Sequence, residues 1–395
     1  MGLFMDIFSK KSRFYNVKLP VYLAALAISA LPVSVMAQPA PGAPPAPSTP
    51  TAPSTPTAPN ALTNAQRFAA LEAVTYISLS PDGANIAFIT PGAGQSADLF
   101  VVGTAEGSVP RRALHSSGDP EHLSDCRWAT NERIVCRIVS RVRAEGRILS
   151  SSNIISVDAT GGNLVMLSRR HDRNSGYFDF RGGAVIDWMP QSPGSVLMTR
   201  SYTQSSATGA NISRNDEGIG VDLVDVTTGT ARQVERPRQD VFHYLTDGNG
   251  NLRIMANRDW NPDAGRLSGV VRYFYRPAAG GRWEPLTTYD LLSEEGLSIV
   301  AVDAANNRAI GFAKVDGRQA VVSLALDGSG TRTTVFAHPQ VDVDEVITIG
   351  RNQRVVGATF ATDRRQAVMT DTRLQAMTTS LSRALGGKNI YIVNT

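Results

Sequence analysis

From Tyr76 onward, the chain consists of short apolar runs of four to seven residues, separated by Gly, Asp, Asn and Pro. Runs of this length bounded by turn residues are typical of β-strands, and few stretches carry the 3.6-residue period of a helix. The pattern therefore predicts an all-β domain, which we expect to span residues 62–395.

Turn residues in this domain recur in two interleaved sets. The first set is spaced at 46 to 62 residues and contains Asp82, Asn131, Pro193, Gly248, Asn306 and Asn352. The second set lies between these positions and contains Gly107, Gly161, Gly229, Gly280 and Gly328. Each unit then holds two hairpins, and six units of four strands can be counted. Repeated four-stranded units favour a β-propeller; a large β-sandwich is the alternative.

One segment near residue 380 has a helical period. Its apolar face contains Leu374, Met377, Leu381 and Leu385. Asp371 or Thr372 can cap its start and Gly386-Gly387 can end it. We expect a strand over 389–393 to begin a seventh unit. A stop in mid-blade would leave an unpaired edge, so we expect a truncated propeller of seven or more blades when complete.

The amino terminus has the features of an export signal. A basic segment, Lys10 to Lys18, precedes an apolar stretch that ends in the small-residue sequence Val35-Met36-Ala37. We expect a signal peptide over residues 1–37, with cleavage after Ala37; an uncleaved anchor is the alternative. Residues 38–61 are rich in Pro, Ala, Ser and Thr, which predicts an extended linker, with a proline-motif ligand as the alternative. The mature protein is then periplasmic or secreted, without an integral membrane span.

Composition and charge exclude two classes of protein. The 395 residues are 42% hydrophobic and 19% charged, so the chain as a whole is not disordered. The formal net charge is +4, of which +3 lies in residues 1–37, leaving +1 for the remainder. A nearly neutral mature chain does not predict a nucleic-acid partner.

Cys126 and Cys136 are the two cysteines, and they lie at equal distances on either side of Asn131. Equal offsets place them opposite one another on a hairpin, within disulfide range for a non-hydrogen-bonded pair. We expect a disulfide in an oxidising compartment; two buried thiols are the alternative. A metal site is not predicted, because no His or further Cys lies at ligand spacing.

Other polar clusters in the sequence give weaker indications of a functional site. His115 and His122 flank Asp119 and Glu121 in a cluster that could bind a cation, although a solvated loop explains it better. Three further segments give only weak indications of function: His171-Asp172-Arg173 as half of an acid–base pair, Glu294-Glu295 as a holder of a substrate amine, and Asn211-Ile212-Ser213 as a glycosylation sequon. The tryptophans, Trp128, Trp188, Trp260 and Trp283, are expected to pack between blades. No cofactor is predicted.

Several motifs carry a family resemblance. TYISLSPDGANIAFIT resembles the strand–turn–strand of TolB-type and WD-like propellers. VIDWMPQSPGSVLMTRS at 185–201, YLTDGNGNLRIMA at 244–256 and TDTRLQAMTTSLSRALGG at 370–387 are more specific. In this order they resemble the amino-terminal propeller of exported bacterial prolyl oligopeptidase family members, the acylaminoacyl and dipeptidyl peptidases. The resemblance covers residues 62–395.

The resemblance implies a propeller that precedes an α/β-hydrolase domain and admits peptides to its Ser, Asp and His residues. No GxSxG nucleophile motif occurs in the 395 residues. The nearest string, residues 94–98, lacks the second Gly, so we assign no catalytic residue. We expect a substrate-gating propeller whose 395 residues are not themselves catalytic, with peptide substrates acting through a hydrolase domain that these residues lack. A complete, non-catalytic TolB-like periplasmic binding propeller is the alternative.

Overall fold

The computed structural model describes residues 64, 68–144, 146–168, 182–202, 217–261, 265–277, 280–388, 390 and 392. Residues 71–395 form one compact unit. The expected signal peptide and linker, residues 1–61, lie outside the described residues and stay predictions, as do most residues of the strand expected over 389–393. Ile390 and Ile392, which are described, have no strand assignment.

The first three sheets each have four antiparallel strands. Blade 1 contains β1 (Tyr76–Leu79), β2 (Asn85–Pro91), β3 (Ala97–Gly103) and β4 (Arg111–Ser116). Blade 2 contains β5 (Glu121–Trp128), β6 (Arg133–Ala144), β7 (Arg147–Asp158) and β8 (Val165–Met166). Blade 3 contains β9 (Ala184–Asp187), β10 (Ser195–Tyr202), β11 (Gly218–Asp225) and β12 (Ala231–Arg238). In each blade, successive strands along the chain are neighbours in the sheet.

The next three sheets continue the pattern with two variations. Blade 4 contains β13 (Val241–Thr246), β14 (Leu252–Asn257), β17 (Val270–Tyr275) and β18 (Glu284–Asp290), with a hairpin of β15 (Trp260–Asn261) and β16 (Arg266–Leu267) inserted. Blade 5 contains β19 (Ser298–Asp303), β20 (Arg308–Val315), β21 (Arg318–Ala325) and β22 (Arg332–Phe336). Blade 6 has three described strands, β23 (Val343–Ile349), β24 (Arg354–Ala361) and β25 (Arg365–Met369). It therefore differs from the expected four-stranded unit.

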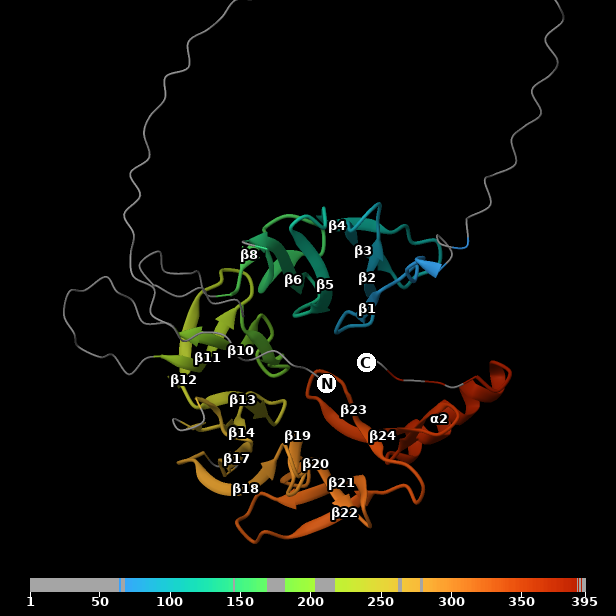
Figure 1. Ribbon diagram of the computed structural model, residues 1–395. Coiled ribbons are helices and arrows are strands. Elements are labelled where there is room, and N and C mark those ends of the chain that lie inside the picture. The colour runs from blue at the N-terminus through green and yellow to red at the C-terminus, as the bar shows by residue number, and fades with distance from the viewer. Residues whose placement is uncertain are drawn as a thin grey trace, which may run out of the picture. The chain divides into compact units, whose positions relative to one another are not determined.

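The six sheets form a β-propeller, as the sequence predicts. The first strand of each sheet lies toward the middle of the arrangement and the later strands lie toward the rim (Figure 1). β1 lies against β5, β9 against β13, and β13 against β19. The first set of predicted turns joins the first two strands of the six blades. The second set joins the last two strands of blades 1–5.

Apolar side chains from neighbouring sheets form the core. Alternation along β2 sends Ala87 and Ile89 into a cluster with Leu99 and with Trp128 of blade 2. The Trp128 indole also donates a hydrogen bond to the Ser78 carbonyl of blade 1, at 3.1 Å. Similar clusters join each following pair of blades. Trp188 and Trp283 lie in two of them, as predicted for inter-blade packing, and nothing is described of the Trp260 side chain.

The predicted helix is present as α2 (Thr372–Ala384), which packs against β25. Asp371 is its N-cap, and its side chain accepts hydrogen bonds from the backbone of Arg373 and Leu374. Leu374 packs against the blade 6 cluster. The rest of the expected apolar face, Met377, Leu381 and Leu385, is 43% to 57% exposed. The face predicted from the helical period is therefore partly buried at Leu374 in the first turn and exposed beyond it.

A repeated arginine ties hairpins together and was not recognised in the sequence. The pattern Asn-x-Arg opens the second strand of four blades, with the arginines Arg133, Arg253, Arg308 and Arg354. Arg133 reaches the Asp158 carboxylate at 2.6 Å, at the second turn of its blade. In blade 6, Arg354 binds Asp371 at 2.8 Å. The cap of α2 thus replaces the turn carboxylate as acceptor.

These arginine contacts predict a loss of stability in acid. The hydrogen bond from Arg133 holds the pKa of Asp158 below its ordinary value, as the bond from Arg354 does for Asp371. A carboxylate with a lowered folded-state pKa contributes stability above its unfolded pKa of about 4, and that contribution is lost as the pH falls below it. We expect the difference in urea midpoint between the wild type and Asp158→Asn to be largest near neutral pH and to shrink below about pH 4.

Asp363, an exposed turn residue in blade 6, provides the matched control for this experiment. Asp363→Asn should leave the urea midpoint unchanged at every pH. A difference between wild type and Asp158→Asn that stays constant down to the lowest pH would contradict the assignment.

Candidate binding channel

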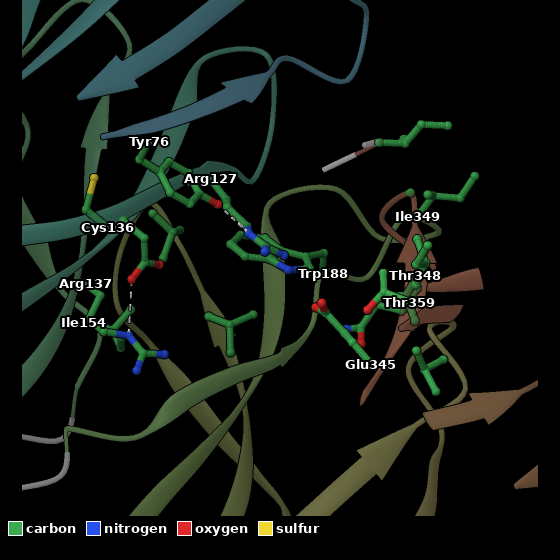
Figure 2. A pocket seen from close by; sticks show the side chains of 18 residues that line it. Tyr76, Arg127, Cys136, Arg137, Ile154, Trp188, Glu345, Thr348, Ile349 and Thr359 are labelled. Carbon is green, nitrogen blue, oxygen red and sulfur yellow. Dashed lines mark hydrogen bonds and ion pairs between the residues drawn. The ribbon is translucent and has the colours of Figure 1, made fainter. Parts of the chain in front are cut away.

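The first strands of four blades line a cavity of about 820 Å³. Tyr76 comes from β1, Asp125 and Arg127 from β5, Val185 from β9, and residues 345–349 from β23. We call this cavity the channel. Its volume lies in the range of ligand pockets. Figure 2 shows the side chains of blade 2 on one side and those of blade 6 on the other.

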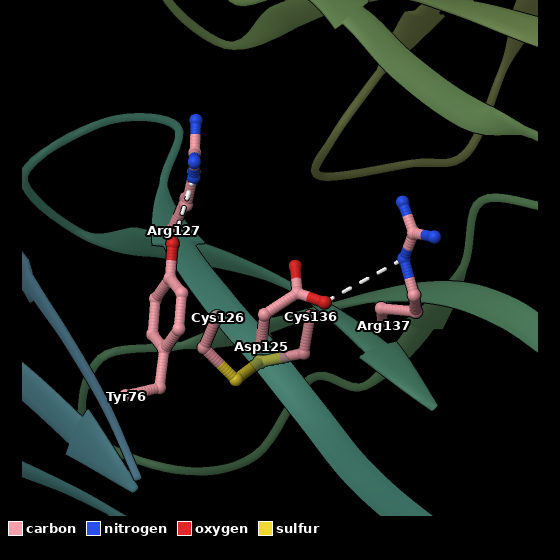
Figure 3. Close-up of a disulfide and its surroundings, with 6 residues drawn as sticks. All are labelled: Tyr76, Asp125, Cys126, Arg127, Cys136 and Arg137. Atoms are coloured by element: carbon pink, nitrogen blue, oxygen red, sulfur yellow. Dashed lines mark hydrogen bonds and ion pairs between the residues drawn. A yellow bond between two sulfur atoms is a disulfide. The ribbon is translucent and has the colours of Figure 1, made fainter. Parts of the chain in front are cut away.

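Charged and polar side chains cover the blade 2 wall of the channel. The Arg127 Nε donates a hydrogen bond to the Tyr76 hydroxyl at 2.8 Å, which joins blade 2 to blade 1. Asp125 forms an ion pair with Arg137, with 3.5 Å between Oδ2 and Nε (Figure 3). Glu345, on the blade 6 wall, is exposed, and within the described residues no ion pair includes it. The walls therefore offer both positive and negative groups to a ligand.

A disulfide lies directly behind this wall. The register of β5 and β6 pairs Cys126 with Cys136, as their symmetric spacing predicts. Their Cα atoms are 4.1 Å apart, close to the separation of a non-hydrogen-bonded antiparallel pair. The two sulfurs are bonded in the structure (Figure 3), and both cysteines are fully buried. Because side chains alternate along a strand, Asp125 and Arg127 face the channel while Cys126 faces the core.

The polar clusters singled out in the sequence lie elsewhere. His115 binds Asp98 at 2.8 Å, and His122 lies 3.2 Å from the Gln95 carbonyl. Glu294 pairs with Lys314 in an exposed loop. None of these residues lines the channel. Residues 171–173 and 211–213 are outside the described residues.

Across the described ranges, no group of three or more His, Cys, Asp or Glu side chains is placed to hold a metal ion. No helix in the described part of the chain has the length and apolar character needed to cross a bilayer.

Sequence reasoning missed the channel residues themselves. Arg127, Glu345 and Gln353 lie far apart in the sequence, and no motif includes all three. Alternation along β5 was a usable signal, because it places Asp125 and Arg127 on one face with Cys126 on the other. Which blade faces that surface depends on the closure of the propeller.

The chain is similar to several solved structures at low sequence identity. No family model matches the chain, and no curated protein matches it in sequence. Among solved structures, an acylaminoacyl peptidase in complex with Z-Gly-Gly-Phe-chloromethyl ketone is similar at 12% identity and a TM-score of 0.39. That match covers 78% of this chain and 46% of that chain. This chain therefore spans less than half the length of that peptidase.

Two other similar structures are matched over more of their length. The β-propeller domain of the trilobed protease from Pyrococcus furiosus has 12% identity and a TM-score of 0.41, with 75% of this chain and 78% of that chain covered. TolB from Acinetobacter baumannii has 10% identity and a TM-score of 0.28, with 68% of this chain and 55% of that chain covered. Likeness at this level does not assign a family, and the propeller is established by the order of the sheets.

Proposed function

We propose that this chain is the substrate-gating propeller of an exported serine peptidase of the prolyl oligopeptidase family, and that its channel receives extended peptides. The observation that carries the proposal is the channel, which is bordered by strands at the inner edges of four sheets. Among the described strands, β1, β5, β9 and β23 each have a sheet neighbour on one side only. An edge strand offers unpaired N–H and C=O groups, which an extended peptide can bind through its own backbone.

The family part of the proposal is supported by the ordered motifs at 185–201, 244–256 and 370–387. The chemistry belongs to a hydrolase domain, because the 395 residues contain no GxSxG motif. In this arrangement the propeller selects substrates by size: an unfolded segment fits between the inner strands, and a folded protein does not.

The test begins with the genomic reading frame beyond the codon of Thr395. We expect it to encode an α/β-hydrolase domain with GxSxG, followed by Asp and His. A fluorophosphonate probe should label the full-length product and leave the 395-residue chain unlabelled. The full-length product should cleave a short chromogenic peptide faster than the same peptide held within a folded domain.

Three results would overturn this proposal. Specific labelling of the 395-residue chain would place a nucleophile within it. Equal cleavage of the free and the folded-domain substrates would remove the gating role. A stop codon after Thr395, together with binding of an envelope protein by the folded chain, would favour the TolB-like alternative.

We also propose export, with cleavage after Ala37 and a disulfide between Cys126 and Cys136 in the mature protein. The direct apposition of the two cysteines in β5 and β6 supports this. Protein isolated from the native host should begin at Gln38. It should show no free thiols when denatured without reductant, and two after reduction. An intact amino terminus with two free thiols would contradict the proposal.

A further inference from the structure

The turn between β23 and β24, residues 350–353, crosses from blade 6 to the far side of the propeller. The Arg351 guanidinium donates hydrogen bonds to the Trp128 carbonyl at 3.3 Å and the Ala129 carbonyl at 2.6 Å, both in blade 2. It also donates to the Trp188 carbonyl of blade 3, at 2.9 Å. Blades 2 and 3 are not next to blade 6 in the order of the sheets. The turn therefore spans the middle of the propeller.

Two neighbours of Arg351 make further contacts on this side. The Gln353 amide donates a hydrogen bond to the Ile186 carbonyl of blade 3 at 3.2 Å. The Asn352 carbonyl lies so close to Gly248 of blade 4 that a Cβ there would be 2.0 Å from it. Turns of blades 2, 3, 4 and 6 thus meet in one place.

The same turn forms one end of the channel. Gly350 and Gln353 line the cavity together with Trp188. β23 runs from Val343 to Ile349, so Glu345 lies toward the other end of this wall and the turn lies where the strand stops.

Arg351 is not part of the repeated architecture. The residue before Asn-x-Arg is Thr130 in blade 2, Gly250 in blade 4 and Ala305 in blade 5, all small side chains. Only blade 6 among these four has an arginine at this position. Burial lowers the pKa of Arg351, and the nearby Asp187 carboxylate opposes that shift. An arginine keeps its charge at neutral pH, so its bonds to three carbonyls are charge-assisted.

We propose that the β23–β24 turn is a gate that closes one mouth of the channel, and that Arg351 holds it closed against blades 2 and 3. A ligand then enters and leaves through the opposite mouth, and passage through the propeller requires the turn to move. The claim that this gate controls the passage of peptides rests on the proposed function. The claim that the turn closes one mouth of the channel does not.

Hydrogen exchange measured by mass spectrometry tests whether Arg351 holds the turn. In Arg351→Met, we expect amides of residues 350–353 to exchange about tenfold faster, the factor given by losing about 1.4 kcal/mol of closing free energy. Gln353→Ala removes one bond and should give a smaller increase. Arg364→Met, at an exposed turn of the same blade, is the matched control and should exchange at the wild-type rate. Blade 5 segments should be unchanged in all three variants.

Chemical access tests whether the turn closes a mouth. Thr348 is exposed on the channel wall next to the turn, so Thr348→Cys provides a reporter thiol. The measured quantity is the ratio of two labelling rates of this thiol, that with a bulky polyethylene-glycol maleimide divided by that with a small maleimide. We expect this ratio to rise several-fold when Arg351→Met is added. It should stay constant when Arg364→Met is added. If Arg351→Met does not fold, Arg351→Lys and Gln353→Ala take its place.

Either of two results would overturn the gate. Unchanged exchange of residues 350–353 in a folded Arg351→Met protein would show that Arg351 does not hold the turn. Faster exchange with an unchanged labelling ratio would show that the turn closes no mouth. Neither readout uses a peptide or a hydrolase domain, so failure of the gate is distinguishable from failure of the peptidase proposal.

Discussion

Asp222→Asn is expected to lower the free energy of unfolding by about 3–5 kcal/mol, the usual cost of removing one partner from a buried ion pair. The Asp222 carboxylate accepts from Arg200 Nη1 at 3.1 Å and from the Tyr202 hydroxyl at 2.6 Å. Asp222 is 3% exposed and Arg200 is 7% exposed. Water therefore cannot solvate the Arg200 guanidinium in place of the lost carboxylate charge. The variant leaves a buried guanidinium facing a neutral amide.

The position of the pair explains why the effect should extend beyond blade 3. Arg200 also donates to the Leu167 carbonyl, which follows the last strand of blade 2. Both side chains thus lie at the contact between two blades that line the channel. Urea denaturation at pH 7, followed by tryptophan fluorescence, gives the change in midpoint.

An exposed ion pair and a double variant complete the experiment. Asp259 pairs with Arg272 on the surface, where the two side chains are 42% and 55% exposed. Asp259→Asn should therefore lower the free energy of unfolding by less than about 1 kcal/mol. The double variant Arg200→Met with Asp222→Leu should recover most of the stability, because a buried pair can often be replaced by apolar side chains. Equal costs for Asp222→Asn and Asp259→Asn would show that burial of the pair does not determine its contribution.

Local signals were sufficient to predict the blades. Turn residues such as Asp82, Asn131 and Gly328 act on the few residues around them, and the hairpins lie where these residues predict them. The alternation of β5 and the symmetric spacing of its cysteines also act locally, and the predicted register is confirmed. Blade 6 departs from the pattern because β25 is followed by helix α2, whose N-cap is Asp371, at the position where the other blades have a turn and a fourth strand.

The channel could not be predicted in the same way, because it depends on contacts between distant segments. Tyr76 binds Arg127 across 51 positions, and Arg351 binds Ala129 across 222. A single sequence shows Arg351 as one arginine in a turn, and only the arrangement of blades places three carbonyls around it. The sequence nevertheless shows that Arg351 is an exception. When the four Asn-x-Arg segments are aligned, it is the only arginine at the position before the Asn.

Gly248→Ala should lower the free energy of unfolding by about 3 kcal/mol. It should also disturb the gate from the blade 4 side. Gly248 has a φ of +72°, in the left-handed region, which costs a residue with a Cβ about 1–2 kcal/mol. The new Cβ would also lie 2.0 Å from the Asn352 carbonyl, so the turn of blade 6 must move away. Displacing the turn breaks hydrogen bonds worth about 1 kcal/mol each.

Gly194 separates these two causes, because it has a φ of +91° and nothing within 4 Å of a Cβ added there. Gly194→Ala should therefore cost only the conformational part, about 1–2 kcal/mol, and leave labelling of the channel thiol unchanged. Gly248→Ala should raise that labelling as Arg351→Met does. Combining Gly248→Ala with Arg351→Met should add little to either variant, because both release the same turn. If the two glycine variants have equal costs and equal labelling, the contact between blade 4 and the turn does not hold the gate closed.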